Sequence, residues 1–214
     1  MAANDHPENP APRLLADGAS LEEIEEAAES CVSCHLYENA TQTVFGMGAE
    51  QASMVLVGEQ PGDSEDIHGE PFVGPAGRLL DEALSDAGID REATYVTNVV
   101  KHFKWKAGPN PSKPRLHAKP NRTEVNACRP WLDAEVERLD PAVVVCLGAT
   151  AAQALLGSDF RVTRDHGRPI EFGTRWVVAT LHPAAVLRSR GSEERQRQYG
   201  QLVADLQIAA GLVG

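Results

Sequence analysis

Polar side chains able to bind a small molecule follow the first apolar run of this sequence. Residues 53–58 (SMVLVG) lead into a glycine-rich turn, Gly58-Glu59-Gln60-Pro61-Gly62-Asp63. Two glycines and a proline let a backbone turn tightly and approach a ligand closely. The turn lacks the Gly-Lys-Ser/Thr of a Walker loop, and its glycine spacing is not that of a dinucleotide fingerprint. It predicts a binding loop of another kind, with a purely structural turn as the alternative.

Three further side chains fall where the same pocket would form. Asn98 ends an apolar, β-branched run, and a buried carboxamide has the donors and the acceptor that suit the edge of a nucleobase. A turn-capping asparagine is the alternative. His182 follows the run WVVATL and could donate to a developing oxyanion, or be a structural histidine. Phe72 could stack on a ring or belong to the core. Together with the turn, these independent features predict one pocket.

The cysteines form a separate candidate site. Cys31 and Cys34 have the two-residue spacing of a metal chelate, and Cys128 starts inside a predicted helix. Cys146 lies in the apolar run AVVVCLG, where we expect a small buried hydrophobic residue. His102 is a candidate fourth ligand. Three cysteines and one histidine fit zinc, and they also fit a [4Fe-4S] cluster with one substituted ligand, so the residues alone leave the metal open.

The charge of the chain is unevenly distributed. The net charge is −11, which argues against a general nucleic-acid-binding surface. Residues 101–122, however, contain seven basic residues and no acidic one, which is the pattern of a small site directed at a polyanion. A solvated loop is the alternative. The basic residues are Lys101, Lys104, Lys106, Lys113, Arg115, Lys119 and Arg122.

Strands and helices that alternate along the chain would position these groups. Alternation of this kind predicts a parallel sheet between helices, a three-layer α/β/α sandwich with four central strands. Ligands of such sheets bind beyond the carboxyl ends of the strands, where the polar groups lie. The predicted strands are 53–58, 94–100, 142–148 and 176–181, and the predicted helices are 21–30, 75–87, 123–139, 149–156 and 193–212.

Length and composition indicate one globular domain. We expect a disordered tail over 1–20 and a single domain over 21–214, with an inserted basic loop at about 103–122 that is longer than most loops. Apolar residues make up 42% of the chain, but no run is long enough to span a membrane. The polar, proline-rich N-terminus lacks a secretory signal. These features predict a cytoplasmic protein with reduced cysteines, and nothing in them requires more than a monomer.

The ordered motifs resemble the iron–sulfur branch of the uracil-DNA glycosylase superfamily. The resemblance covers about residue 31 to the C-terminus. Gln60, His102 and the long loop are similar to the UdgX subgroup, whose loop Lys-Arg-Arg-Ile-His corresponds here to Lys113-Pro114-Arg115-Leu116-His117. The serines usual after His-Pro are Ala184 and Ala185 here. The matching motifs are Cys31-x2-Cys34, the turn from Gly58 to Asp63, Pro71-Phe72-Val73-Gly74-Pro75-Ala76-Gly77, Thr97-Asn98-Val99-Val100-Lys101, Cys128-Arg129-Pro130 and His182-Pro183.

This resemblance implies a DNA-repair enzyme that flips uracil out of DNA, with single-stranded DNA as the expected substrate. Phe72 would stack on the base, Asn98 would read its polar edge, and His182 would stabilise the departing uracil anion. The other residues expected to bind substrate are Gly58, Gln60, Gly62 and Arg115.

In the UdgX-like interpretation His117 attacks C1′ of the sugar and stays bonded, with Glu59 or Asp63 holding its other ring nitrogen. The resemblance further implies a structural [4Fe-4S] cluster on Cys31, Cys34, His102 and Cys128, with zinc as the alternative. Two other functions remain open. One is a turnover glycosylase that uses water, in which His117 is only a DNA contact. The other is a non-catalytic, metal-bearing module that binds nucleic acid.

Overall fold

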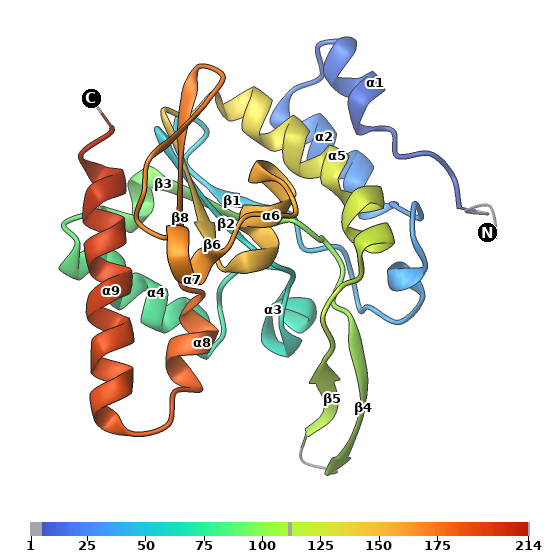
Figure 1. The fold of residues 1–214 in the computed structure, drawn as a ribbon. Helices are drawn as coiled ribbons and strands as arrows, with labels where there is room; N and C mark the ends of the chain where they lie inside the picture. The colour runs from blue at the N-terminus through green and yellow to red at the C-terminus, as the bar shows by residue number, and fades with distance from the viewer. Residues whose placement is uncertain (1–5, 111–112, 214) are drawn as a thin grey trace.

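The computed structural model describes residues 6–110 and 113–213, and its centre is a six-stranded mixed sheet (Figure 1). The four inner strands are parallel, which confirms the predicted parallel core. Two short antiparallel strands at the edges were not predicted, because two or three residues are too few to show an alternating pattern. In spatial order the strands are β1 (Met47–Gly48), β3 (Thr94–Asn98), β2 (Met54–Gly58), β6 (Val143–Leu147), β8 (Arg175–Thr180) and β7 (Ile170–Phe172).

Helices cover both faces of this sheet, as expected for a three-layer sandwich (Figure 1). One layer contains α1 (Ala11–Ala16), α2 (Leu21–Glu29), α5 (Arg122–Leu139) and α6 (Ala149–Leu156). The other contains α4 (Pro75–Asp86), α8 (Pro183–Leu187) and α9 (Ser192–Ala210). The remaining short helices are η1 (His35–Glu38), α3 (Asp63–His68), η2 (Arg91–Ala93) and α7 (Val162–Asp165).

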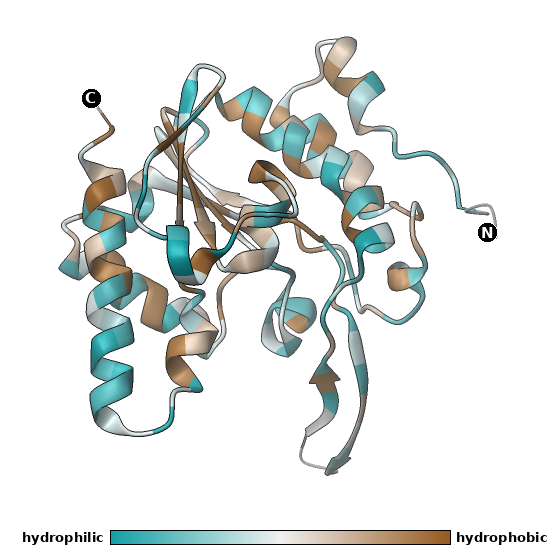
Figure 2. Ribbon diagram, viewed as in Figure 1, coloured by the Kyte–Doolittle hydropathy of each residue, from teal (hydrophilic) through white to brown (hydrophobic). Residues whose placement is uncertain are grey.

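Alternate residues of each inner strand enter different hydrophobic cores. Val55 and Val57 pack with α2, α5 and α6, whereas Leu56 packs with α4 and α9. Both sets are fully buried, which explains why these strands read as continuous apolar runs in the sequence. Figure 2 shows the same arrangement, with apolar strands between helices whose outer faces are hydrophilic. Among the described residues, no helix combines the length and the apolar character that crossing a membrane requires.

Part of the predicted N-terminal tail is ordered. Residues 11–16 form α1 within the segment 1–20, so the prediction of disorder is wrong for this part, while residues 1–5 lie outside the described residues. Asn9 Nδ2 donates to the backbone oxygen of Ala127 at 2.9 Å, and Arg138 donates to that of Leu15 at 3.1 Å. These bonds attach the segment to α5. A helix of six residues is too short to give a clear periodic signal in the sequence.

The basic insertion is a β-hairpin rather than the predicted irregular loop. Strands β4 (Trp105–Asn110) and β5 (Lys113–His117) pair antiparallel and project away from the sandwich (Figure 1). Prolines at positions 109 and 114 argue against strands in a sequence, because proline cannot donate to a ladder. A two-stranded ribbon consists only of edge strands, where proline is tolerated. The hairpin places His117 opposite Trp105, at its base.

Candidate active site

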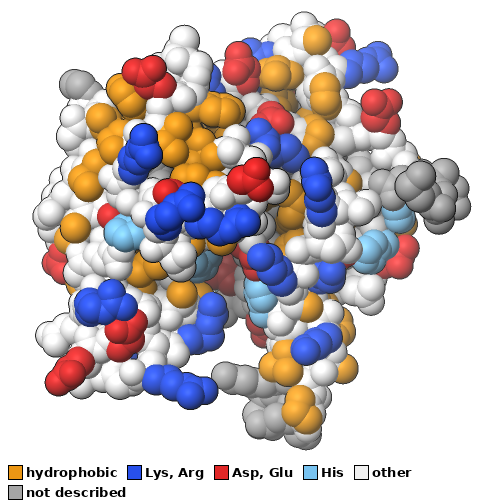
Figure 3. Space-filling model, in the orientation of Figure 1, with side chains coloured by type: hydrophobic (Ala, Val, Ile, Leu, Met, Phe, Trp, Pro, Cys, Tyr) orange, Lys and Arg blue, Asp and Glu red, His pale blue; other side chains and the backbone are white. Residues whose placement is uncertain are grey.

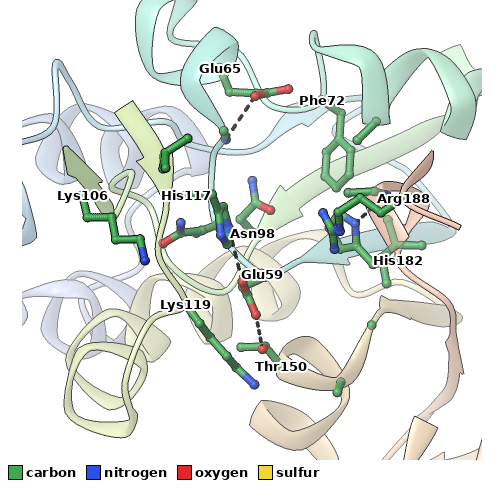
Figure 4. A pocket seen from close by; sticks show the side chains of 18 residues that line it. Glu59, Glu65, Phe72, Asn98, Lys106, His117, Lys119, Thr150, His182 and Arg188 are labelled. Carbon is green, nitrogen blue, oxygen red and sulfur yellow. Dashed lines mark hydrogen bonds and ion pairs between the residues drawn. The ribbon is translucent and has the colours of Figure 1, made fainter. Parts of the chain in front are cut away.

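A pocket of about 770 Å³ opens at the carboxyl ends of β2 and β3 (Figure 4). This is the edge of the sheet where the sequence predicted ligand binding. The hairpin and the segment after β8 close the pocket, so that residues from distant parts of the chain face one another. The predicted site residues that line it are Glu59, Gln60, Gly62, Phe72, Asn98, His117 and His182.

Gly58 makes room for two of the lining side chains. A Cβ atom at this position would lie 2.3 Å from Asn98 Oδ1 and 2.7 Å from Phe72 Cζ, so any larger residue would displace both groups. Phe72 has a left-handed backbone, with φ of 60°, a conformation that non-glycine residues rarely adopt. Its ring lies 6.2 Å from the His182 ring at an angle of 23°. The strained backbone therefore aims an aromatic face into the pocket.

The carboxamide of Asn98 carries a buried oxygen that has no hydrogen-bond partner among the described residues. Asn98 is only 2% exposed, and this oxygen is its Oδ1 atom. A buried acceptor without a partner is energetically unfavourable, so a ligand that donates a hydrogen bond to it would bind favourably. The N–H group of a flat heterocycle would supply that donor.

His182 is held as a neutral hydrogen-bond donor. Its Nδ1 atom accepts a hydrogen bond from the backbone N–H of Ala184 at 3.1 Å, so the proton of the neutral ring is on Nε2. Burial, together with the positive charge of Arg188 and that of His117 when its ring is protonated, lowers the pKa of His182 to about 4. The ring is therefore uncharged at neutral pH and presents an N–H to the pocket.

His117 of the hairpin faces the carboxylate of Glu59. The Nε2 atom of His117 lies 3.4 Å from Glu59 Oε1, and the other oxygen of Glu59 accepts a hydrogen bond from the hydroxyl of Thr150 (Figure 4). Burial lowers the pKa of His117 below 6.5, Glu59 opposes this effect, and Arg188 adds to it. The pair thus combines an oriented carboxylate with an imidazole that is neutral near pH 7, which are the parts of an activated nucleophile.

Asp63, the second predicted partner of His117, has a different neighbour. Its Oδ1 atom lies 2.6 Å from Nε of Arg115, and Nη1 of Arg115 donates to Asp66 at 2.5 Å. Arg115 also lies over the rings of Phe103 and Trp105, with its Cζ atom 5.4 and 5.8 Å from their centres. In this structure Arg115, which we expected to bind substrate, joins the hairpin to α3 and positions His117 two residues later.

Gln60 also supports the hairpin, a role that sequence reasoning missed. Its Nε2 atom donates to the backbone oxygens of Lys104 at 3.0 Å and Ala118 at 3.3 Å, and its Oε1 accepts from Lys104 N at 3.2 Å. One carboxamide therefore holds both ends of the insertion. Glu65 holds the loops in a similar way, by accepting from the backbone N–H groups of Gly62 and Gly74 at 3.0 and 2.8 Å.

Basic side chains surround the pocket. Lys106, Lys119 and Arg188 line it, and Figure 3 shows lysine and arginine side chains around the hollow on this face of the molecule. Of these three, Lys106 and Lys119 belong to the basic segment found in the sequence. Arg188 lies outside that segment and reaches the pocket from the end of α8. An acidic protein thus presents local positive charge at its pocket, which suits a phosphate backbone.

Three predicted metal ligands are buried cysteines in one core. The indole N–H of Trp131 donates to Cys31 Sγ at 3.2 Å, and the backbone N–H of Lys101 donates to Cys128 Sγ at 3.1 Å. Burial raises the pKa of Cys34, and it raises that of Cys128 to about 12. Buried thiols that receive N–H groups suit a metal centre, because a metal supplies the positive charge that keeps thiolates ionised. In the described residues, no three His, Cys, Asp or Glu side chains surround a point where a single ion would bind.

The fourth predicted ligand, His102, is buried beside Thr43. The hydroxyl of Thr43 donates to the backbone oxygen of Ala28 at 3.0 Å, so it accepts from Nε2 of His102, also at 3.0 Å. This arrangement leaves the lone pair of the neutral ring on Nδ1. Burial lowers the pKa of His102 to about 4, so the ring is uncharged, as a metal ligand must be. Cys146 lies in β6, within the sheet, as predicted for a hydrophobic residue.

Comparison with known proteins shows the family to which the chain belongs. Residues 45–207 match the family model of the uracil DNA glycosylase superfamily. The chain is 39% identical over 178 residues to a type-4 uracil-DNA glycosylase of Thermotoga maritima, covering 82% of this chain and 88% of the relative. It is also 39% identical over 193 residues to a type-4 uracil-DNA glycosylase of Archaeoglobus fulgidus, covering 86% of this chain and 92% of the relative.

Proposed function

The chain belongs to the uracil-DNA glycosylase superfamily, and from this premise we propose that it excises uracil from DNA and is then captured at C1′ through His117. The observation that carries the excision step is the buried, unpartnered Oδ1 of Asn98 inside the pocket. The observation that carries the capture step is the His117–Glu59 pair on the same pocket wall.

Asn98, Phe72 and His182 would act on the flipped base. The Oδ1 atom of Asn98 accepts the N3–H of uracil, which removes the unfavourable state of the empty acceptor. Phe72 lies against the face of the ring. The neutral His182 donates its Nε2–H to a uracil oxygen as negative charge develops there, an interaction that is strongest in the transition state.

The chemical step begins with heterolysis of the bond between N1 of uracil and C1′. The bonding electrons leave with the base as a uracil anion, and the sugar becomes an oxocarbenium-like cation. The ring nitrogen of His117 that does not face Glu59 donates its lone pair to C1′, forming a C–N bond. The positive imidazolium then transfers its remaining ring proton toward Glu59, so the adduct carries a neutral imidazole.

The principal alternative is a turnover glycosylase in which water captures the sugar and His117 only contacts DNA. The exposure of half of the His117 side chain is compatible with such a contact. Capture by His117 is favoured because both hairpin ends are hydrogen-bonded to Gln60, and Arg115 holds β5 against α3. A residue needed only for a phosphate contact would not require this degree of positioning. A module that binds nucleic acid without catalysis would not need carboxylates at the pocket.

We further propose that Cys31, Cys34 and Cys128 hold a [4Fe-4S] cluster, with His102 as the fourth ligand through Nδ1. When bound, the cluster would cross-link the segment after α2, helix α5 and the segment after β3, which is a structural role. The same donors could hold zinc, and the metal content of the purified protein distinguishes the two. The proposed substrate is uracil in single-stranded DNA.

A denaturing gel tests this function directly. Purified protein is mixed with a single-stranded oligonucleotide that contains one uracil, then heated in detergent before electrophoresis. We expect a band at the summed mass for the wild type and for His68→Ala, an exposed histidine of α3 that serves as the control. His117→Ala should give no such band. An adduct in His117→Ala would contradict the assignment of the nucleophile, and alkali-sensitive DNA without an adduct in the wild type would establish the turnover alternative.

A further inference from the structure

A buried ion pair lies next to Asn98, the residue that we propose binds the base. Lys101 is fully buried, and its Nζ atom lies 2.5 Å from Glu135 Oε2, on the face of α5 that packs against the sheet. Burying two charges removes their hydration, so replacement of such a pair by apolar residues is often neutral or stabilising. Stability alone therefore does not explain the presence of a lysine at this position. The acceptors of its hydrogen bonds indicate what else it does.

Every donor of the Lys101 ammonium has an acceptor. Besides Glu135, Nζ donates to Thr97 Oγ1 at 2.6 Å and to the backbone oxygen of Asn98 at 2.8 Å. The hydroxyl of Thr97 in turn donates to Glu135 at 2.9 Å. The ammonium thus holds the last two residues of β3, and the second of them carries the unpartnered carboxamide. A lysine with three partners in fixed positions permits little movement of that strand end.

The remainder of Lys101 is also fixed. Its backbone N–H donates to Cys128 Sγ at 3.1 Å, and its backbone oxygen accepts from Val44 N at 2.8 Å. One residue earlier, the backbone N–H of Val100 donates to the backbone oxygen of Glu59 at 3.0 Å. The segment after β3 is therefore attached at one side to the cysteine core and at the other to the loop that carries Glu59.

We propose that Lys101 is a positioning residue for uracil recognition, because it fixes the backbone of Asn98 and thereby the direction of its Oδ1 atom. This inference rests on the proposed excision of uracil. Lys101 is not among the residues that line the pocket, so it would not contact a bound base. It acts through Asn98, and Glu135 acts by holding Lys101.

The test replaces the pair while avoiding an isolated buried charge. Lys101→Met combined with Glu135→Leu removes the ammonium and its counter-ion together. The matched control is Tyr95→Phe, which removes another hydrogen bond to Glu135, 3.1 Å long, but leaves the contact between Lys101 and Asn98 intact. Iron content and the thermal midpoint are measured for each protein, to show that the cysteine site and the fold are retained.

Two readouts separate positioning from a loss of folded protein. We expect the double variant to release uracil about tenfold more slowly at saturating protein, and its inhibition constant for free uracil to rise about tenfold. The protein concentration that half-saturates the DNA should not change, because phosphate contacts are retained. A merely structural defect would lower the amount of active protein without changing the inhibition constant. Tyr95→Phe should keep the wild-type constant.

The outcomes that overturn this inference are distinct. A folded double variant with the wild-type inhibition constant would overturn it, as would an equal shift in Tyr95→Phe. If the double variant does not fold, Glu135→Gln weakens the hold on Lys101 and should give a smaller shift in the same direction; an unchanged constant would again overturn the inference. A wild-type protein that releases no uracil would overturn the proposed function, and this inference with it.

Discussion

Arg115, on the inserted hairpin, donates to the fully buried carboxylate of Asp66 on α3 at 2.5 Å. Asp66 also accepts from the backbone N–H and the hydroxyl of Thr41, at 2.9 and 2.6 Å. The hairpin is thus connected to the body of the protein through one buried ion pair, close to the proposed nucleophile. Its position is determined by this connection and by Gln60, since the ribbon itself projects into solvent (Figure 1).

Arg115→Met should therefore affect capture more than base release. It leaves Asp66 buried without its cation, which we expect to lower the free energy of unfolding by about 3 kcal/mol. His117 loses its fixed position, so adduct formation should slow by about a hundredfold while uracil release falls much less. Urea unfolding and a time course on denaturing gels measure the two effects.

The matched control is Arg129→Met. Arg129 pairs with Asp133 one turn later on the exposed side of α5, so its loss should change stability by less than about 1 kcal/mol and leave the adduct unchanged. Equal slowing of release and capture in Arg115→Met would show that Arg115 contacts the substrate, as the sequence suggested.

Substitution of the two candidate carboxylates should rank them. Glu59 faces His117, whereas Asp63 faces Arg115. We expect Glu59→Gln to slow capture by about a hundredfold, because the imidazole loses the carboxylate that takes its proton. Asp63→Asn should have a smaller effect, through a loosened hairpin. Rates of adduct formation under single-turnover conditions measure both, and the reverse order would assign the role to Asp63.

The pH dependence of capture should follow the lowered pKa of His117. Only the neutral ring has a lone pair, so capture should be constant above about pH 7 and fall as the pH drops through a pKa below 6.5. Glu59 raises this pKa and Arg188 lowers it. Glu59→Gln should therefore move the acidic fall to lower pH, and Arg188→Gln should move it to higher pH. Shifts in the same direction would show that another group controls the profile.

Much of the fold could be predicted because its inner strands are buried on both faces. Short apolar runs located β2, β6 and β8, a run rich in β-branched residues located β3, and the rule that ligands bind at carboxyl ends of parallel strands located the pocket. The edge strands and α1 were missed because they are too short to show a period. Helix α5 begins at Arg122, one residue before the predicted start at 123, with Asn121 and Glu124 forming its capping box.

Within the site, residue types could be predicted but partners could not. Glu59, Asn98, Phe72, His117 and His182 share one pocket; the sequence pattern suggested this for four of them, and the resemblance of its loop suggested it for His117. The partners depend on tertiary geometry: two acidic residues of the same turn, Glu59 and Asp63, could each have served His117, and only the folded hairpin brings Glu59 to it. Thr150 lies in α6 and Arg188 directly follows α8, and neither position belongs to a motif found in the sequence, so no sequence signal pointed to them.

Gly58→Ala tests the packing of the pocket. The added methyl would collide with Asn98 Oδ1 and Phe72 Cζ, and a displacement of about 1 Å at a reacting centre can lower rates by about a hundredfold. We expect uracil release to fall by this factor, with a loss of stability of about 1–3 kcal/mol from overpacking. Gly200→Ala in α9 is the control, since no atom lies near its added Cβ. That variant should stabilise the protein by about 0.5–1 kcal/mol and release uracil normally, and normal release by Gly58→Ala would contradict the proposed base pocket.

Comparison of Cys34→Ser with Cys146→Ala tests the proposed cluster. Both cysteines are buried and free, but Cys34 belongs to the chelating pair Cys31-x2-Cys34, whereas Cys146 lies within the sheet strand β6. Loss of a ligand should lower the iron content and the thermal midpoint, because metal binding contributes directly to folding. The chemistry of the remaining folded protein should change less, since the pocket is lined by none of these residues. Cys146→Ala should keep the full iron content, so any fall in its stability reports only the lost packing. Full iron in purified Cys34→Ser would show that Cys34 is not a ligand, and equal iron loss in both variants would show that iron retention reflects general stability rather than coordination.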